Sequence, residues 1–224
     1  MAVTRDDVIH TAIQLLDEVG LDGLTLRRLA TELGISAPTL YWHFRDKREL
    51  LDAMAEVMVA EYRQGTAPIP EDLPWEKKIA ESLRQQYRAI IAYRDGARVV
   101  AGNRPTEATL PMIELFLSRW IAVGFPPAEA MAMILSLGDF VLGSALEYQS
   151  EVERRRVQSP TTQKEIWAKM EAYPNLYTAA TERMHAMQED RRDSFEYGLS
   201  LMIAGLKLRL AEIKAQKKAE DAGT

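Results

Sequence analysis

The chain has 224 residues, of which 47% are hydrophobic and 27% charged, and its net charge is −5 at pH 7. This apolar fraction excludes a disordered chain, and the absence of cysteine excludes disulfides, thiolate metal sites and a cysteine nucleophile. No stretch approaches the roughly 18 uninterrupted apolar residues of a membrane span, and the first residues lack the apolar run of a signal peptide. We therefore expect a cytoplasmic protein, and the acidic net charge means that any affinity for nucleic acid is local.

Apolar residues recur at helical spacing along the chain, and the dipeptides that close β-hairpins are rare, so the sequence predicts an all-α protein. Thr4 and Asp7 match a capping box at the start of the first helix, and Gly20 marks its end. Thr25 and Ser36 have the side chains that cap the next two helices. Helices are predicted over residues 26–33, from Ser36 onward, and over 47–63, 75–92, 95–101, 110–123, 127–155, 163–172, 175–187 and 190–215.

Residues 65–74 read GTAPIPEDLP, and the three prolines in this segment break any helix. The segment is the best candidate for a domain boundary. We expect a helix-turn-helix domain over residues 1–47, a connecting helix over 48–64, a larger helical domain over 65–215 and a disordered tail over 216–224.

Residues 25–48 have the proportions of a helix-turn-helix, with a glycine-containing turn between two short helices. Five basic residues against two acidic ones give this segment a charge of +3. Polar and aromatic side chains are predicted to face outward, at Ser36, Thr39, Tyr41, Trp42 and His43. Such groups suit contacts with phosphates and with the thymine methyl. The alternative is that Tyr41, Trp42 and Phe44 pack against the first helix; we favour packing for Phe44 and a DNA contact for Tyr41 and His43.

The run GLDGLTLRRLATELGISAPTLYWHFRDKRELLDA resembles the TetR family of bacterial transcription regulators. The resemblance continues through YRDGARVVAGNRPTE, GFPPAEA, LGDFVLGSALEYQ and FEYGLSLMIAGL, which look like the ligand-binding and dimerisation domain of the tetracycline repressors. It implies an all-helical homodimer with a three-helix DNA-binding domain and a larger regulatory domain. The implied partners are double-stranded operator DNA and a small-molecule inducer, with no cofactor and no metal.

The resemblance also assigns base or phosphate contacts to individual residues of the first domain. They are Arg27, Ser36, Ala37, Pro38, Thr39, Tyr41, Trp42, His43 and Lys47. Ser36 and Ala37 stand where longer polar side chains read bases in the tetracycline repressors, and neither can make a bidentate contact with a purine. We therefore do not expect this chain to bind the operator sequence of those repressors. Arg27 is the residue whose guanidinium suits a bidentate contact with guanine.

In the second domain the resemblance implies an inducer pocket. Its expected lining is Ser82, Gln86, Val100, Asn103, Arg104, Pro105, Ile113, Phe116, Leu117, Ile134, Asp139 and Glu147. Val100 and Asn103 replace the metal-binding histidine and threonine of the tetracycline repressors, so we expect no response to tetracycline–magnesium. Asp139 and Glu147 suit a cationic or hydroxyl-rich ligand; alternatively they are structural and paired with an arginine such as Arg104.

The two longest predicted helices, 127–155 and 190–215, contain small residues inside apolar faces. They are Gly138, Gly143 and Ala145 in one helix and Gly198, Ala204 and Gly205 in the other. Because glycine destabilises a helix interior, this pattern indicates close helix–helix approach. The residues leave open whether the approach is within one subunit or between two. The resemblance implies an intersubunit four-helix bundle.

An enzyme is not expected, because the chain has no Gly-rich phosphate loop and no tuned acid–base pair, and no two of its three histidines lie at ligand spacing. We expect a ligand-responsive transcriptional regulator, in the main a repressor that an inducer releases from a palindromic operator. The alternative is an architectural DNA-binding protein or an activator without a small-molecule inducer.

Overall fold

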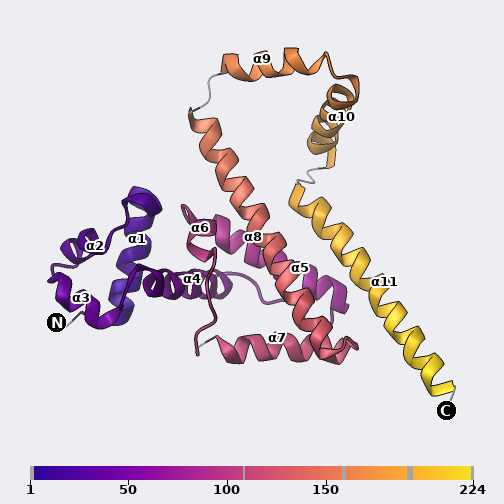
Figure 1. The fold of residues 1–224 in the computed structure, drawn as a ribbon, viewed down its shortest axis with the longest axis horizontal. Coiled ribbons are helices and arrows are strands. Elements are labelled where there is room, and N and C mark those ends of the chain that lie inside the picture. Colours follow the sequence, from indigo (N-terminus) through magenta and orange to yellow (C-terminus); the bar gives the residue numbers. More distant parts are fainter. Residues whose placement is uncertain (1–2, 108, 158–159, 191–193, 223–224) are drawn as a thin grey trace.

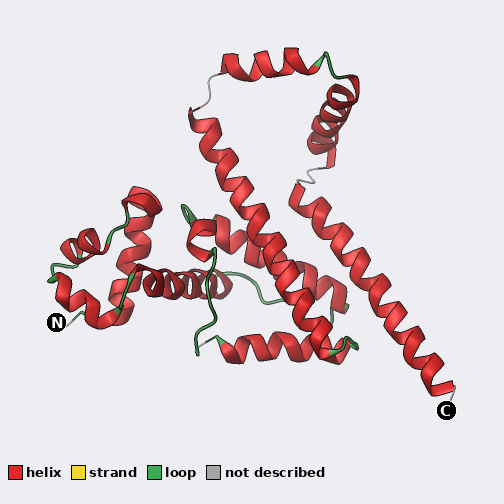
Figure 2. Ribbon diagram, in the orientation of Figure 1, coloured by secondary structure: helices red, strands yellow, loops and turns green. Residues whose placement is uncertain are grey.

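The computed structural model describes residues 3–107, 109–157, 160–190 and 194–222, and within these ranges the chain forms helices and loops but no strand (Figure 1, Figure 2). The predicted all-α class is confirmed. The helices are α1 (Arg5–Gly23), α2 (Leu26–Glu32), α3 (Ala37–His43), α4 (Lys47–Gln64), α5 (Trp75–Ile91), α6 (Gly96–Val100), α7 (Leu110–Val123), α8 (Pro127–Val157), α9 (Pro160–Met170), α10 (Pro174–Asp190) and α11 (Ser194–Ala222).

The helix boundaries depart from the predicted ones mainly in the last third of the chain. α9 begins at Pro160 instead of near residue 163, and α11 begins at Ser194 instead of near residue 190. α11 continues to Ala222, so residues 216–222 are helical and the prediction of a disordered tail over 216–224 is wrong for them. Alanine, lysine and glutamate predominate there and are strong helix formers, which is sufficient to extend a helix that is already nucleated.

Side chains cap the first three helices as the sequence predicted. Thr4 Oγ1 accepts the Asp7 N–H at 3.1 Å, and the Asp7 carboxylate accepts the Thr4 N–H at 2.8 Å, which completes the capping box. The Thr25 and Ser36 side chains each accept an N–H from three residues further on. The sequence predicted that α1 ends at Gly20. The helix breaks at this residue, where φ is +71°, but a further turn follows and α1 ends at Gly23.

The first hydrophobic core joins α1, α2, α3 and the N-terminal half of α4. Leu16, Leu29, Leu40, Phe44 and Met54 are among its buried members. These side chains set the angle between α2 and α3, as expected for a helix-turn-helix. One member of the core lies far along the chain: Val99 of α6 is fully buried in it. The two domains therefore share apolar packing where α6 meets α4.

The second core lies between α5, α7, α8 and α11. Tyr87 of α5 stacks on Phe195 of α11 with ring centroids 4.1 Å apart, and Phe195 stacks in turn on Phe140 of α8 at 5.5 Å. Elsewhere in this core, Trp120 and Phe125 pack together with ring centroids 5.4 Å apart. Three long helices are thus joined by aromatic contacts that the helical periodicity could not assign.

α8 is apolar along most of its length, but only a small part of its surface is buried by the rest of the chain. Over Pro127–Arg156 it is long and apolar enough to cross a membrane by length and composition, with a mean hydropathy of 1.5, and only 22% of that segment is buried. Uninterrupted apolar runs in the sequence do not reveal this property, because Asp139 and Glu147 interrupt them. α9 and α10 connect the C-terminal end of α8 to the N-terminal end of α11 (Figure 1).

Gly96 tests the packing where the two domains meet. A Cβ atom at Gly96 would lie 2.1 Å from the backbone oxygen of Ile90, which no side-chain movement can relieve. We expect Gly96→Ala to lower the free energy of unfolding by about 1–3 kcal/mol or more. Circular dichroism during urea unfolding, at one protein concentration, measures the change.

Gly65→Ala is the matched control. Gly65 has φ −81°, and the nearest atoms to an added Cβ are backbone oxygens at 3.7 Å, which is ordinary contact. This variant should unfold within about 0.5 kcal/mol of the wild type. Equal stabilities for the two variants would contradict the close approach at Gly96.

Candidate DNA-binding surface and regulatory junction

α3 presents polar and aromatic side chains to solvent. Ser36 Oγ lies 2.8 Å from Thr39 Oγ1, so the two hydroxyls that precede and begin the helix are held together. Tyr41 is 54% exposed and Trp42 is 88% exposed, so the alternative in which both pack against α1 is wrong. Phe44 is 1% exposed, which confirms the predicted packing for that residue. Two large aromatic side chains on a solvated face are available to contact a partner.

Arg5 of α1 holds the C-terminal end of α3, a role that the sequence did not reveal. Its guanidinium lies 3.9 Å from the ring centroid of Phe44 and donates to the backbone carbonyl of His43. It also forms an ion pair with Glu49 of α4 at 3.5 Å. One cation thus satisfies an unpaired carbonyl at the end of α3 and ties three helices together. The result is a fixed orientation for α3 in the first domain.

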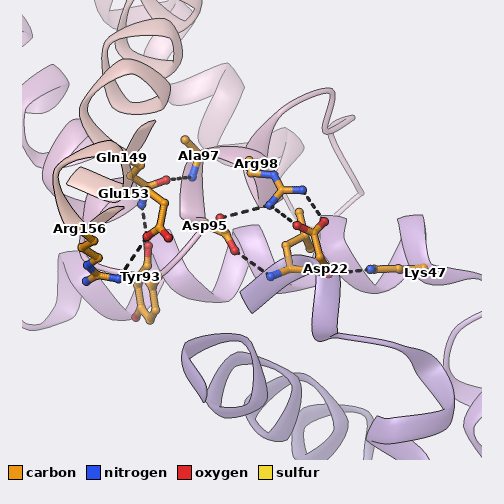
Figure 3. Close-up of polar contacts among 10 residues, drawn as sticks. Asp22, Lys47, Tyr93, Asp95, Ala97, Arg98, Gln149, Glu153 and Arg156 are labelled. Atoms are coloured by element: carbon orange, nitrogen blue, oxygen red, sulfur yellow. Dashed lines mark hydrogen bonds and ion pairs between the residues drawn. The ribbon is translucent and has the colours of Figure 1, made fainter. Parts of the chain in front are cut away.

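Arg27 and Lys47, both expected to contact DNA, lie in different settings. Arg27 is exposed on α2, and its side chain forms no hydrogen bond or ion pair with the residues that the structure describes. Lys47 Nζ instead donates to the carbonyl of Leu21 at 3.0 Å (Figure 3). The phosphate contact of Lys47 stays a prediction; in this structure the ammonium closes the end of α1.

The turn between α5 and α6 holds the C-terminal end of α1. Asp95 has φ +54°, in the left-handed region, and its carboxylate accepts the N–H of Leu21 at 2.8 Å. Arg98 pairs with Asp22 at 2.7 Å (Figure 3), and Arg94 donates to the carbonyl of Glu18 at 2.8 Å. The unpaired groups at the end of a helix are therefore satisfied by another domain.

Gln149 of α8 completes this junction. Its amide Nε2 donates to the carbonyl of Tyr93 at 2.8 Å, and its Oε1 accepts the N–H of Ala97 at 3.0 Å (Figure 3). α8 thus contacts the same turn that holds α1. The motifs around these residues were noted in the sequence, but the role of Gln149 was missed because nothing in the sequence indicates which turn a helix 52 residues later contacts.

A second contact between domains follows α6. Arg48 of α4 donates to the carbonyl of Ala101 at 2.9 Å and to the side-chain oxygen of Asn103, while it pairs with Asp52 at 2.7 Å. Asn103, expected to line the inducer pocket, is therefore engaged by the connecting helix. The Thr106 hydroxyl donates to Glu56 at 2.6 Å. The segment after α6 runs against α4 through polar contacts.

The residues expected to line the inducer pocket are only partly brought together. Half-buried are Ser82, Gln86, Val100, Asn103, Ile113, Phe116, Leu117 and Ile134, and exposed are Arg104, Pro105, Asp139 and Glu147. Asp139 and Glu147 line a hollow of about 680 Å³, together with Tyr87, Phe140 and Phe195 and without Phe116. A second hollow, of about 730 Å³, lies between residues 67–73, α5 and α11 and contains none of the expected residues.

Neither Asp139 nor Glu147 forms an ion pair or a hydrogen bond within the described parts of the chain. The alternative in which an arginine such as Arg104 pairs with them is therefore wrong for this chain by itself.

Comparisons with known proteins agree with this two-domain arrangement. The family model for bacterial regulatory proteins of the tetR family matches residues 8–54, and the model for the tetracyclin repressor-like C-terminal domain matches residues 67–210. The chain belongs to the TetR family. The interval between the two matches falls in the second half of α4 and the loop after it.

Individual TetR relatives are similar over nearly the whole chain. The tetracycline repressor protein class C of Escherichia coli is 35% identical over 225 residues, covering 97% of this chain and 98% of that protein. Apo ActR of Streptomyces coelicolor is 29% identical with a TM-score of 0.75, covering 95% and 99% of the two chains. BioQ, solved with its double-stranded DNA operator, is 27% identical with a TM-score of 0.60, covering 92% and 98%. This member of the TetR family is thus a DNA-binding transcriptional regulator with a ligand-binding domain and not an enzyme, as predicted.

His10 connects the first domain to the junction. The ring Nδ1 lies 2.7 Å from the carbonyl of Asp6, and Nε2 lies 3.0 Å from Glu61 of α4, whose other oxygen accepts the Tyr93 hydroxyl at 3.3 Å. The bond to the Asp6 carbonyl, with help from Glu61, raises the pKa of His10 above its usual value. Both ring nitrogens can donate only in the charged imidazolium, so protonation strengthens the contact between α1 and α4.

This raised pKa predicts a pH-dependent contribution to stability. Since the pKa of His10 is higher in the folded state, its stabilisation is complete below the unfolded pKa of about 6.5 and is lost as the pH rises through the folded value. We expect the melting temperature of the wild type to exceed that of His10→Gln at about pH 5.5 and the difference to shrink by about pH 8.

His185→Gln is the control, because His185 is exposed on α10 and its side chain forms no hydrogen bond or ion pair with the described residues. Its melting temperature should follow that of the wild type across the same pH range. A constant difference between His10→Gln and the wild type would show that protonation of His10 has no part in the α1–α4 contact.

Proposed function

We propose that the protein is a homodimeric repressor that binds a palindromic operator and is released from it by a small molecule other than tetracycline–magnesium. The observation that carries the proposal is the junction at the end of α1, where Asp95, Arg98 and Gln149 connect the DNA-binding domain to α8 of the regulatory domain. A ligand that moves α8 or α6 would change the position of α1, and with it that of α3.

The exposed surface of α2 and α3 supports operator recognition. Helix-turn-helix dimers insert one recognition helix in each of two major grooves, about 34–36 Å apart, so a two-fold dimer requires a two-fold site. BioQ, a relative of this chain, was solved with its double-stranded DNA operator. Arg27 has a guanidinium that can donate two hydrogen bonds to guanine, while Tyr41 and Trp42 provide exposed apolar surface for contact with DNA.

Arg27→Ala tests this assignment. We expect it to weaken operator binding by about 1–3 kcal/mol and to relax the preference at one base pair of each half-site, because a bidentate contact with guanine is lost. Selection of an operator from random DNA, followed by fluorescence anisotropy with the selected site and its single-base variants, measures both effects.

Arg119→Ala is the matched control, since Arg119 is exposed on α7 and forms no ion pair with the described residues. It should bind the operator as the wild type does. Footprinting that protects one asymmetric half-site, or DNA binding without sequence preference, would overturn the proposed operator.

Exposed apolar residues on α8 and α11 support a homodimer. Leu135 of α8 and Leu201 and Leu208 of α11 are each more than half exposed, and α8 is mostly uncovered. A Cβ atom added at Gly138, Gly143 or Gly205 would meet no atom within 4 Å, so these glycines are not needed for close approach within one chain. Gly198 differs, because its Cβ would lie 2.8 Å from the ring of Phe140.

This contrast favours an intersubunit role for three of the four glycines. A second copy of α8 and α11 would cover the apolar face, and the small residues would let the helices approach closely.

Leu201→Glu combined with Leu208→Glu tests the dimer. Burying a leucine contributes about 1.5–3 kcal/mol, and the double change acts twice in a symmetric dimer, so we expect monomers and loss of operator binding. Analytical ultracentrifugation gives the oligomeric state. Leu115→Glu is the control, since Leu115 is 50% exposed but lies on α7. Loss of the dimer in this control, or retention of the dimer in the double variant, would contradict the proposed interface.

The metal-binding positions of the tetracycline repressors support a different inducer. Val100 packs against both hydrophobic cores, and the side-chain oxygen of Asn103 accepts a bond from Arg48. Within the described residues, no three histidine, aspartate or glutamate side chains are grouped to hold a metal ion. Magnesium prefers octahedral oxygen ligands, which valine cannot supply.

We therefore expect tetracycline with magnesium to leave both the tryptophan fluorescence and operator binding of this protein unchanged. The class C repressor of Escherichia coli, titrated in parallel, is the positive control. Magnesium-dependent quenching at micromolar tetracycline, with release of the operator, would overturn this part of the proposal.

A further inference from the structure

Arg63, in the last turn of α4, lies against α7 and has no acidic partner among the residues that the structure describes. Its Nη1 lies 2.9 Å from the sulfur of Met112, and its guanidinium carbon lies 5.4 Å from the ring centroid of Phe116. Met112 and Phe116 are four residues apart and so occupy one face of α7. The cation is thus held between a thioether and an aromatic ring.

Its hydrogen-bonding capacity is almost unused. A guanidinium has five N–H donors, and a thioether sulfur is a weak acceptor. No carboxylate of the described residues pairs with Arg63. The nearest acid before it on the same face, Glu56, accepts a bond from Thr106 instead. No buried side-chain nitrogen of the described residues lacks a partner, so the unpaired nitrogens of Arg63 are not fully enclosed by the protein.

The electrostatics of Arg63 differ from those of other arginines in the domain. Arg84 and Arg98 each pair with a carboxylate, which raises their pKa. Burial alone lowers the pKa of Arg63. The helix C-terminus favours a positive charge there but offers only partial compensation. A half-buried cation without a counter-ion is costly to the free protein, and an anion would remove that cost.

Phe116, which the cation overlies, was expected to line the inducer pocket, whereas Arg63 was not. A lone arginine at the end of a helix is ordinary in a sequence, so no signal indicated that it faces α7. The sequence instead favoured a cationic or hydroxyl-rich ligand, from the carboxylates Asp139 and Glu147. Those two line a separate hollow that contains neither Phe116 nor Arg63.

We propose that the inducer is a flat aromatic carboxylate whose anionic group pairs with Arg63 and whose ring packs against Phe116. This inference rests on the proposed function, since it names the chemical class of the inducer. Arg63 pairs with both carboxylate oxygens, and the thioether of Met112 and the ring of Phe116 supply the apolar wall.

Three isosteric probes test the charge preference: 2-naphthoate, 2-naphthamide and 2-naphthylmethylammonium. Trp120, buried on α7 one turn after Phe116, reports binding by fluorescence. We expect the full-length protein to bind the carboxylate about tenfold or more tightly than the amide, and the cation least tightly. Arg63→Met should abolish the difference between carboxylate and amide, whereas Arg63→Lys should retain part of it. Arg119→Gln, at an exposed position of α7, should bind all three probes as the wild type does.

A stability measurement separates ligand binding from a structural role. Because Arg63→Met removes a cation without a counter-ion, it should melt at the same temperature as the wild type or higher without probe, and its melting temperature should rise less on addition of 2-naphthoate.

Equal binding of the three probes, binding of none, or an unchanged carboxylate preference in Arg63→Met would overturn the inference. Operator binding by the wild type is measured separately, so absence of a carboxylate preference with normal operator binding refutes only the inducer class. Absence of operator binding refutes the proposed function.

Discussion

The structure depends on the way in which the end of α1 is held by a different domain. Gly20 breaks α1 and leaves backbone groups that the helix itself cannot satisfy. Asp95, Arg94 and Lys47 satisfy them from the α5–α6 turn and from α4. An added Cβ at Gly20 would lie 3.0 Å from Asp95, so the two segments are in close contact. The orientation of the DNA-binding domain therefore depends on a turn that belongs to the regulatory domain.

That turn is also the place where the regulatory domain acts on the connecting helix. Gln149 binds it from α8, Val99 is buried in the first core, and Arg48 contacts the segment after α6. The polar contacts can be replaced by hydrogen bonds to water with little change in free energy, whereas moving Val99 out of the core would expose apolar surface. A ligand shifts such a junction only by the difference between its affinities for the two arrangements. A junction made mainly of hydrogen bonds and the Arg98–Asp22 ion pair keeps that difference within reach of a small molecule.

Two regions with expected pocket residues differ in charge: the hollow that contains Asp139 and Glu147, and the surroundings of Arg63 and Phe116. The hollow with Asp139 and Glu147 is acidic and lies between α8 and α11, the helices whose apolar faces lack cover. Arg63 lies between α4 and α7, close to the segment that joins the domains. A ligand bound beside Arg63 would touch the connecting helix directly, which makes that region the better placed of the two to alter the position of α3.

Sequence alone determined the helical class, the capping of α1, α2 and α3, and the burial of Phe44, because these depend on local periodicity and on side chains three or four residues apart. It also located the helix-turn-helix and the order of the domains. Tertiary structure decided that Lys47 closes α1, that Gln149 binds the turn at Tyr93 and that Arg63 has no counter-ion within the described parts of the chain. Those facts depend on which distant groups are brought within 3 Å of one another, and no local pattern encodes that. The tail at 216–222 is helical because a long helix, once formed, extends through residues that would not nucleate one.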